Sequence, residues 1–245
     1  MDALTFGSAT TRILDWAGAG DSRYVCVATV NNVMTGHTDP DFRRMHNEAD
    51  LVISDGMPLV WGLKLLGVRG AERVYGPELL PRVCEAAARG GVPVGFFGGA
   101  PDVLEELTVR LRGRCPGLRI VYAHSPPFRP LSRAEDREVV EAIRASGARI
   151  LFVGLGCPKQ ERWMAAHRGA IPAVMLGVGA AFDFFAGRKP IAPAWMQRSG
   201  LEWVFRLATE PRRLWRRYVL QNPVFVALFA AQLVRSRLPR SSGDG

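Results

Sequence analysis

The sequence has little that could build a disulfide framework or a metal site. Its four cysteines are scattered and form no Cys-x-x-Cys pair, and its four histidines show no metal-ligand spacing. We therefore expect no structural metal. Because disulfides are rare where thiols are kept reduced, this cysteine usage also favours a cytosolic protein.

Long hydrophobic runs are also scarce. The first residues lack the basic region and long apolar stretch of a signal peptide, so none is predicted. The longest apolar run near the C-terminus, Pro223 to Val234, has about a dozen residues, fewer than the ~20 that span a bilayer. The sequence thus predicts a protein that is neither secreted nor membrane-spanning.

Acidic residues are outnumbered, 23 against 32 lysines and arginines, for a net charge of +9. Residues 201–245 alone hold eight arginines, no lysine and three acids, a net of +5. A local basic surface indicates an anionic partner. A lipid surface or a phosphate fits better than nucleic acid, because no helix-turn-helix, RNA-binding signature or lysine-rich tract accompanies the charge.

What the sequence does contain is a regular alternation of apolar runs and helical patterns. We predict strands over residues 24–30, 51–54, 92–99, 118–123, 149–156 and 172–180. Helices are expected near residues 38–48, 57–66, 77–90, 101–114, 132–146 and 158–168, with a capping box at Ser132 and Glu135.

This order predicts an α/β fold, doubly wound around a mainly parallel sheet with Rossmann-like character, because continuously apolar strands suit a sheet covered on both faces. We expect an α/β core over residues 1–195, with two lobes divided near residues 75–90 as an alternative. Residues 196–245 are expected to form an arginine-rich helical appendage.

Three strand ends carry unusual chemistry, and ligands of such sheets bind beyond the carboxyl ends of the strands. Asp55 ends the second strand in the segment Ser54 to Gly56. It could simply serve as a turn or N-cap aspartate. Alternatively it is a general base, with its pKa raised by burial beside Met57, Pro58 and Trp61.

The segment GLGCPKQERW, which begins at Gly154, combines paired glycines with a proline suited to a helix start. A helix beginning there directs free N–H groups toward a phosphate, with Gly156, Lys159 and Gln160 beside it. An ordinary glycine turn is the alternative. Neither Gly-x-Gly-x-x-Gly nor Gly-Lys-Ser/Thr occurs here, which disfavours a dinucleotide redox enzyme or a P-loop ATPase.

Two further groups have simple alternatives. Thr29 and Asn31 belong to the segment TVNN, which ends the first predicted strand and where asparagines also serve as plain turn formers. Arg73 precedes a glycine-proline turn and could be a solvated surface arginine.

The segment RRLWRRYV, residues 212–219, has a two-sided character on a helix. At about 100° per residue its four arginines share one arc, and Leu214, Trp215, Tyr218 and Val219 fill the other side. Such a helix suits an anionic membrane surface, although a basic helix packed on its own domain has the same pattern.

Seven blocks along the chain together resemble the bacterial WecG/TagA/CpsF glycosyltransferases. In order they are TVNN, ADLVISDGMPLV, ERVYGPEL, FFGGAPDV, FVGLGCPKQERW, GVGAAFDFFAG and APAWMQRSGLEWVFRLATEPRRLWRRY. The resemblance covers residues 24 to 220 approximately. It implies transfer of a sugar, N-acetylmannosamine or another hexose, from a UDP-sugar to a polyprenyl-diphosphate-linked glycan in cell-surface polysaccharide synthesis. The resemblance also implies inversion at the anomeric carbon, no requirement for a metal, and a location on the cytoplasmic face of the membrane.

The resemblance assigns roles to residues by their blocks. Asp55 becomes the general base, and Thr29, Asn31, Arg73 and Gln160 become pocket residues. The appendage is expected to touch the membrane and to direct arginines toward the diphosphate, with Arg206, Arg213 and Arg216 as the matching candidates.

The chain departs from the family pattern at two places. TVNN stands where Thr-Pro-Asn is more usual, and Met57-Pro58 follows the Asp-Gly pair. A non-catalytic nucleotide-sugar-binding or membrane-scaffold protein is the alternative function. The donor sugar, the acceptor glycan and self-association into a homo-oligomer stay open.

Overall fold

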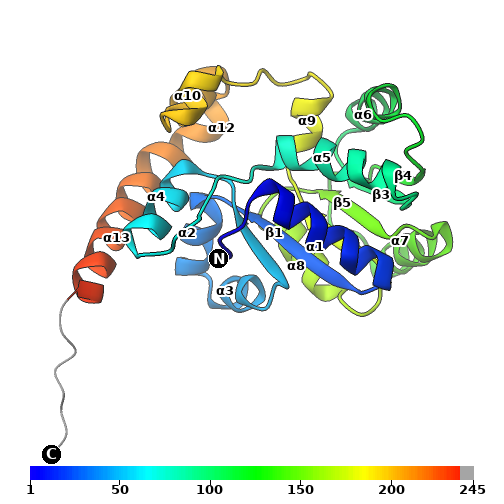
Figure 1. The fold of residues 1–245 in the computed structure, drawn as a ribbon, viewed down its shortest axis with the longest axis horizontal. Coiled ribbons are helices and arrows are strands. Elements are labelled where there is room, and N and C mark those ends of the chain that lie inside the picture. Colours follow the sequence, from blue (N-terminus) through cyan, green and yellow to red (C-terminus); the bar gives the residue numbers. More distant parts are fainter. Residues whose placement is uncertain (238–245) are drawn as a thin grey trace, which may run out of the picture.

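The computed structural model describes residues 1–237, and the end of the predicted appendage, residues 238–245, lies outside the described residues. One six-stranded sheet, entirely parallel in its pairings, forms the centre of the molecule in the order β2-β1-β6-β5-β3-β4 (Figure 1). All six predicted strands are present: β1 (Arg23–Ala28), β2 (Leu51–Ser54), β3 (Val94–Gly98), β4 (Ile120–His124), β5 (Ile150–Gly154) and β6 (Val174–Gly177). The predicted α/β parallel fold is confirmed.

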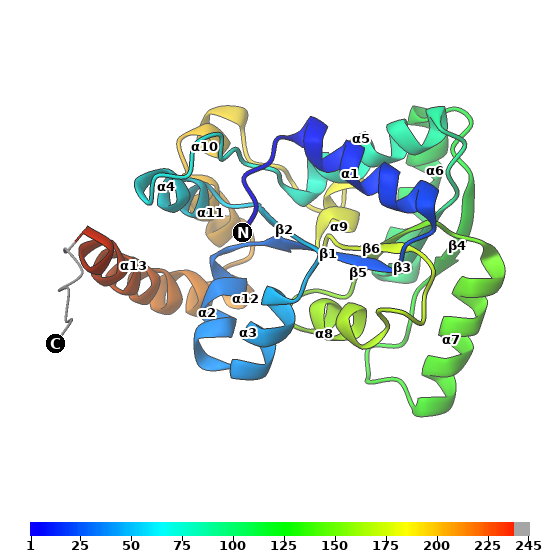
Figure 2. The same ribbon diagram turned by 60° about the horizontal axis from the view of Figure 1, so that its bottom comes forward.

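Helices cover both faces of the sheet (Figure 2). One face packs against α1 (Phe6–Ala19), α5 (Gly76–Arg89), α6 (Pro101–Arg114) and α9 (Ala181–Phe185). The other packs against α2 (Val30–Thr38), α7 (Arg133–Ser146) and α8 (Lys159–Ala166), and α3 (Pro40–Asn47) lies against α2 and α8. Two buried clusters, one on each face, explain why the strands are apolar along their whole length.

The predicted capping box of α7 is confirmed, with Ser132 and Glu135 bonded reciprocally. A second capping box, Thr5 with Ser8, begins α1. Neither this capping box nor the helix was predicted from the sequence. This helix ends at Gly20, whose φ of 76° lies in the left-handed region.

The segment after β1 differs from its prediction. The strand stops at Ala28 rather than Val30, and α2 begins directly after Thr29. Asn31 and Asn32 therefore lie in the first turn of a helix and are neither strand residues nor turn formers. Asn32 accepts the backbone N–H of Thr29, and this bond holds the helix start.

The sheet contains a crevice between β3 and β5. The helix that follows β3, α6, packs on one face, and the helix that follows β5, α8, packs on the other. Adjacent parallel strands whose helices leave on opposite faces form the usual ligand-binding crevice of open α/β sheets. Glycines let the ends of the two strands approach closely here, since a Cβ on Gly98 would lie only 2.6 Å from the carbonyl carbon of Gly154.

Residues 194–237 are mainly helical. The helix α4 (Met57–Leu65) follows β2, the edge strand of the sheet. Much later the chain returns to this end of the molecule as α10 (Ala194–Arg198) and α11 (Glu202–Thr209). It then forms α12 (Pro211–Trp215), a π-helical segment η1 (Arg216–Gln221) and α13 (Asn222–Arg237).

These last three segments form one run, Pro211–Arg237, of 27 residues. By length and composition it is the one helix among the described residues that could cross a membrane. The apolar run is therefore part of a longer helix that meets the length requirement which the run alone does not meet, and the expectation that the protein does not span a membrane stays a prediction.

Candidate active site

Asp55 lies at the carboxyl end of β2, where its backbone N–H donates to the carbonyl of Ala28 on β1 at 2.8 Å. The helix that follows, α4, has Gly56 as its N-cap and no side-chain capping bond. The Asp55 side chain is thus not used as a cap. It is 23% exposed and lines a pocket of about 90 Å³, which we call the small pocket.

Arg73 connects this aspartate to the C-terminal region. Its Nε donates to the Asp55 backbone carbonyl, and its Nη2 lies 3.5 Å from Asp55 Oδ1. The same Nη2 pairs with Glu202 on α11. Arg73 is 13% exposed, so it is not a solvated surface residue.

The surroundings of Asp55 set its affinity for a proton. Burial raises the pKa of this carboxyl above its ordinary value, and the nearby Glu202 carboxylate acts in the same direction. Arg73 and Arg206 act against this rise. An aspartate in this state is a stronger base than one in water.

Two arginines from the C-terminal helices complete the small pocket. Arg206 of α11 lies over the Phe184 ring, 5.4 Å from its centre, and its Nε is buried with no hydrogen-bond partner. Arg217 of η1 donates to the Thr29 hydroxyl at 2.9 Å, and burial lowers its pKa. The small pocket therefore joins one carboxylate of the sheet with guanidinium groups from a distant part of the chain.

A chain of hydrogen bonds leads from this pocket to the end of β5. The Thr29 hydroxyl donates to Asn32 at 2.9 Å, and Asn32 donates to Glu161 at 2.9 Å. Gln160 also donates to Glu161, and its own oxygen accepts the Gly156 N–H at 3.2 Å.

Glu161 at the centre of this chain is 1% exposed, and burial raises its pKa. Asn31 lies beside the chain and donates to the Cys157 sulfur at 3.4 Å. The conformation of the α8 start and that of the α2 start are therefore coupled.

A larger cavity, of about 790 Å³, opens at the crevice between β3 and β5. This volume lies within the usual range of ligand pockets. Its lining contains two acids, Asp136 and Asp183, and six cationic side chains, namely Arg129, Arg133, Lys159, Arg162, Lys189 and Arg213. The excess of positive charge in this lining, together with the α8 N-terminus at Lys159, suits a ligand with phosphate groups.

The structure distributes the predicted site residues as follows. The small pocket holds Thr29, Asp55, Arg73 and Arg206, and the large cavity holds Gly156, Lys159 and Arg213. Asn31 and Gln160 lie between them, Gln160 being buried. Arg216 lines neither and is exposed beside Trp215.

Two charged residues of the small pocket were not predicted as site residues, Glu202 and Arg217. In the sequence Glu202 looks like an ordinary acid of a helix first turn. Arg217 falls on the same helical arc as three other arginines, so a regular helix gives no reason to single it out. Within residues 1–237 no group of three or more His, Cys, Asp or Glu could hold a metal ion.

This arrangement supports one kind of chemistry. A carboxylate of raised basicity can accept the proton of a hydroxyl nucleophile. Guanidinium groups beside it can hold an anionic group of the same substrate, while the larger cationic cavity holds a second anionic ligand. The two pockets, which are lined by different residues, could thus hold two anionic ligands.

Comparison with known proteins agrees with this chemistry. The model of the family described as glycosyl transferase WecG/TagA/CpsF matches residues 1–239. The chain is 32% identical over 207 residues to an N-acetylglucosaminyldiphosphoundecaprenol N-acetyl-beta-D-mannosaminyltransferase of Bacillus spizizenii. That match covers 84% of this chain and 78% of the relative.

Proposed function

The chain belongs to the WecG/TagA/CpsF family of glycosyltransferases, and on that premise we propose that it moves a sugar from a UDP-sugar to a polyprenyl-diphosphate-linked acceptor. N-acetylmannosamine is the first donor sugar to test, since the Bacillus relative is named for its transfer. An acceptor ending in N-acetylglucosamine follows from the same name.

The observation that carries this proposal is the position of Asp55 between cationic groups of two origins. In the proposed reaction Asp55 takes the proton of the acceptor hydroxyl as that oxygen attacks the anomeric carbon. The bond from the anomeric carbon to the UDP oxygen breaks, and UDP leaves with the electron pair. Attack on the side opposite the leaving group inverts the anomeric configuration.

The two cavities suggest where each substrate binds. We place the UDP part of the donor in the large cavity, whose cations and α8 N-terminus face its phosphates. The acceptor diphosphate is placed beside Arg206 and Arg217 in the small pocket. Thr29 in the small pocket, together with Asn31 and Gln160 between the two pockets, would orient the transferred sugar.

No metal enters this scheme, because the cationic side chains themselves stabilise the charge that develops on the leaving diphosphate. We further propose that the protein works at the cytoplasmic face of the membrane. The 27-residue helix that ends in α13 would lie along the surface there, since Phe225 packs against the core of the molecule.

The test combines a donor panel with one substitution. Purified protein is given a set of UDP-sugars and a short-chain lipid-diphosphate acceptor, and products are identified by mass. We expect transfer from one donor, and a loss of about 10²–10⁴ in rate for Asp55→Asn. UDP should still raise the melting temperature of that variant, since the nucleotide site is intact.

Two results would contradict the proposal. Near-normal turnover by the Asp55→Asn variant would show that Asp55 is not the general base. Stabilisation by UDP without transfer to any acceptor would instead favour the non-catalytic nucleotide-binding protein.

A further inference from the structure

Exposed apolar side chains gather on α4, at the end of the sheet that carries the small pocket. Trp61 is 44% exposed, Leu65 is 53% exposed and Leu66 is 37% exposed. Met57, Trp61 and Leu65 follow one another at intervals of four residues and so share one face of the helix. This face begins at the pocket, which Met57 lines, and continues outward into solvent.

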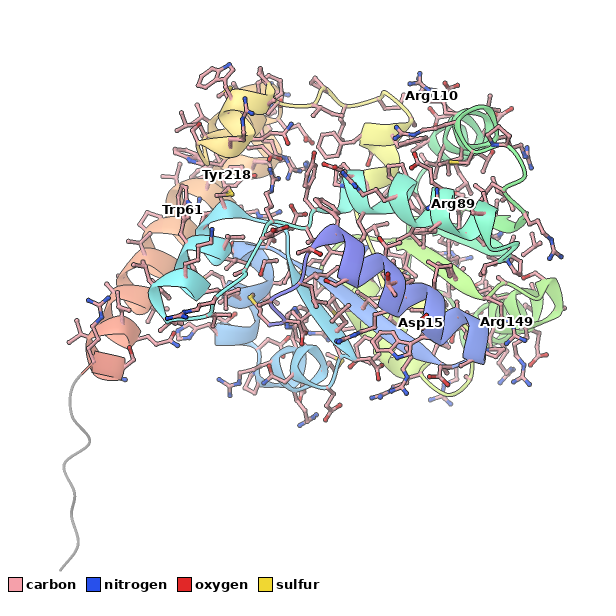
Figure 3. The ribbon with its side chains drawn as sticks, viewed as in Figure 1. Asp15, Trp61, Arg89, Arg110, Arg149 and Tyr218 are labelled. Carbon is pink, nitrogen blue, oxygen red and sulfur yellow. The ribbon has the colours of Figure 1, made fainter. Side chains whose placement is uncertain are left out.

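α4 lies directly beside α13, as Figures 1 and 2 both show. At their contact the Phe229 ring leaves so little room that a Cβ on Gly62 would lie 3.2 Å from it. Figure 3 shows Trp61 of α4 at the same end of the molecule as Tyr218 of η1. The C-terminal run carries exposed apolar residues of its own, among them Val219, Leu220, Val224, Val226, Leu228 and Val234.

The charges within these two helical segments have one sign. Residues 56–70 and residues 211–237 contain no aspartate or glutamate. Lys64 lies in the last turn of α4, Arg69 follows it, and arginines lie near both ends of the C-terminal run. Apolar faces flanked by cations match an anionic lipid surface, where cations meet headgroups and apolar side chains enter the acyl boundary.

We propose that α4 is a second membrane contact, in which Trp61, Leu65 and Leu66 enter the lipid surface beside α13. This inference rests on the membrane association proposed above and extends it from the C-terminal helices to the α/β core. Its consequence is an orientation. Because the small pocket lies between the start of α4 and the residues Tyr218 and Asn222, it faces the bilayer that holds a lipid-linked acceptor.

The experiment measures binding of the full chain to vesicles of phosphatidylcholine and phosphatidylglycerol, mixed at about three to one. The variant is the double substitution Leu65→Asp with Leu66→Asp. The control is Val109→Asp on α6, a site of similar exposure, 57%, on a helix away from α13. We expect the double variant to bind at least about tenfold more weakly and the control to bind like wild type.

A second measurement needs no substitution. Hydrogen exchange of the wild-type chain, with and without vesicles, should show slower exchange in residues 57–66 and no change in α6. Turnover with a water-soluble short-chain acceptor should be the same for the double variant and wild type, since neither leucine lines the pocket.

The outcomes separate the two proposals. Equal vesicle binding by the double variant and wild type, or protection of α13 without α4, overturns the role of α4. So does self-association of wild type that the double variant loses without any change in vesicle binding, because α4 would then contact a second copy. Absence of transfer by wild type would contradict the enzymatic function. The vesicle measurement would still test the membrane contact of α4, because it does not depend on activity.

Discussion

At the scale of single residues, the proton affinity of Asp55 depends on its burial and on charged groups far from it in the chain. Burial and Glu202 raise its pKa, and Arg73 and Arg206 lower it. Arg73 is shared between Asp55 and Glu202, so the two carboxylates compete for one cation. If Asp55 is the base, as proposed above, Glu202 would be a positioning residue that acts on it through charge.

Glu202→Gln should shift the pH dependence of the enzyme. A base works when deprotonated, so kcat/KM rises as pH rises through the pKa of Asp55. Removing the Glu202 charge, and freeing Arg73 for Asp55, lowers that pKa. We therefore expect the acidic limb of the kcat/KM profile to move to lower pH.

Steady-state kinetics across a pH series would measure this shift, with Glu106→Gln on the surface of α6 as the control. A lower kcat with an unmoved limb would show that Glu202 only supports the structure.

Asp55 could be predicted from sequence because an acid that ends an apolar strand falls at the edge of a parallel sheet where ligands bind. Its partner Glu202 could not, because the two are brought together by the return of the chain to the same end of the sheet. Local pattern carries no information about such a return.

At the scale of elements, the π-helical segment Arg216–Gln221 carries Arg217, the arginine of this run that lines the small pocket. In a regular helix, as predicted from the sequence, Arg213, Arg216 and Arg217 would share one arc. In the structure Arg217 and Tyr218 line the small pocket, while Trp215 and Val219 are exposed. A wider turn changes the phase of the residues that follow, and such turns are frequent at functional sites.

Replacing these arginines one at a time should separate their roles. Arg217→Ala removes a charged hydrogen-bond donor from the pocket and should lower kcat/KM for a soluble lipid-diphosphate acceptor by about 10–100-fold. Arg216→Ala should change it by less than about threefold, because Arg216 lines neither cavity. Equal losses from both substitutions would contradict the assignment of Arg217.

The strands could be predicted because burial on both faces leaves a continuous apolar run. α2 could not, since Val30 extends an apolar strand pattern and two asparagines after it look like a turn. The helix forms because Asn32 takes the capping role that glutamate or glutamine usually has.

At the scale of the whole molecule, the small pocket is assembled from the first third of the chain and from its C-terminal helices. Asp55 and Arg73 come from the sheet part, and Glu202, Arg206 and Arg217 come from the C-terminal helices. The division into a core over residues 1–195 and an appendage stays a prediction. The pocket, however, needs contributions from both sides of that boundary.

A chain ended after Gly200 should keep its sheet and lose its activity. All six strands precede this point, whereas the pocket arginines of α11 and η1 follow it. We expect a parallel-sheet circular dichroism spectrum, transfer lowered by at least about 10²-fold, and most vesicle binding lost.

Sedimentation with anionic vesicles at low and high salt would measure the binding, since salt weakens the charged part of it. Unchanged sedimentation of the shortened chain would reject a membrane role for the C-terminal helices.

The pairing of β1 with β6 also has a consequence for how the protein is made. β1 can pair with β2 soon after both leave the ribosome, but its other edge stays open until Val174–Gly177 have been translated. An unpaired apolar edge is a template for aggregation. The nascent chain therefore carries a vulnerable strand through most of its synthesis, and slow translation or scarce chaperones should reduce its yield before any enzyme exists to be assayed.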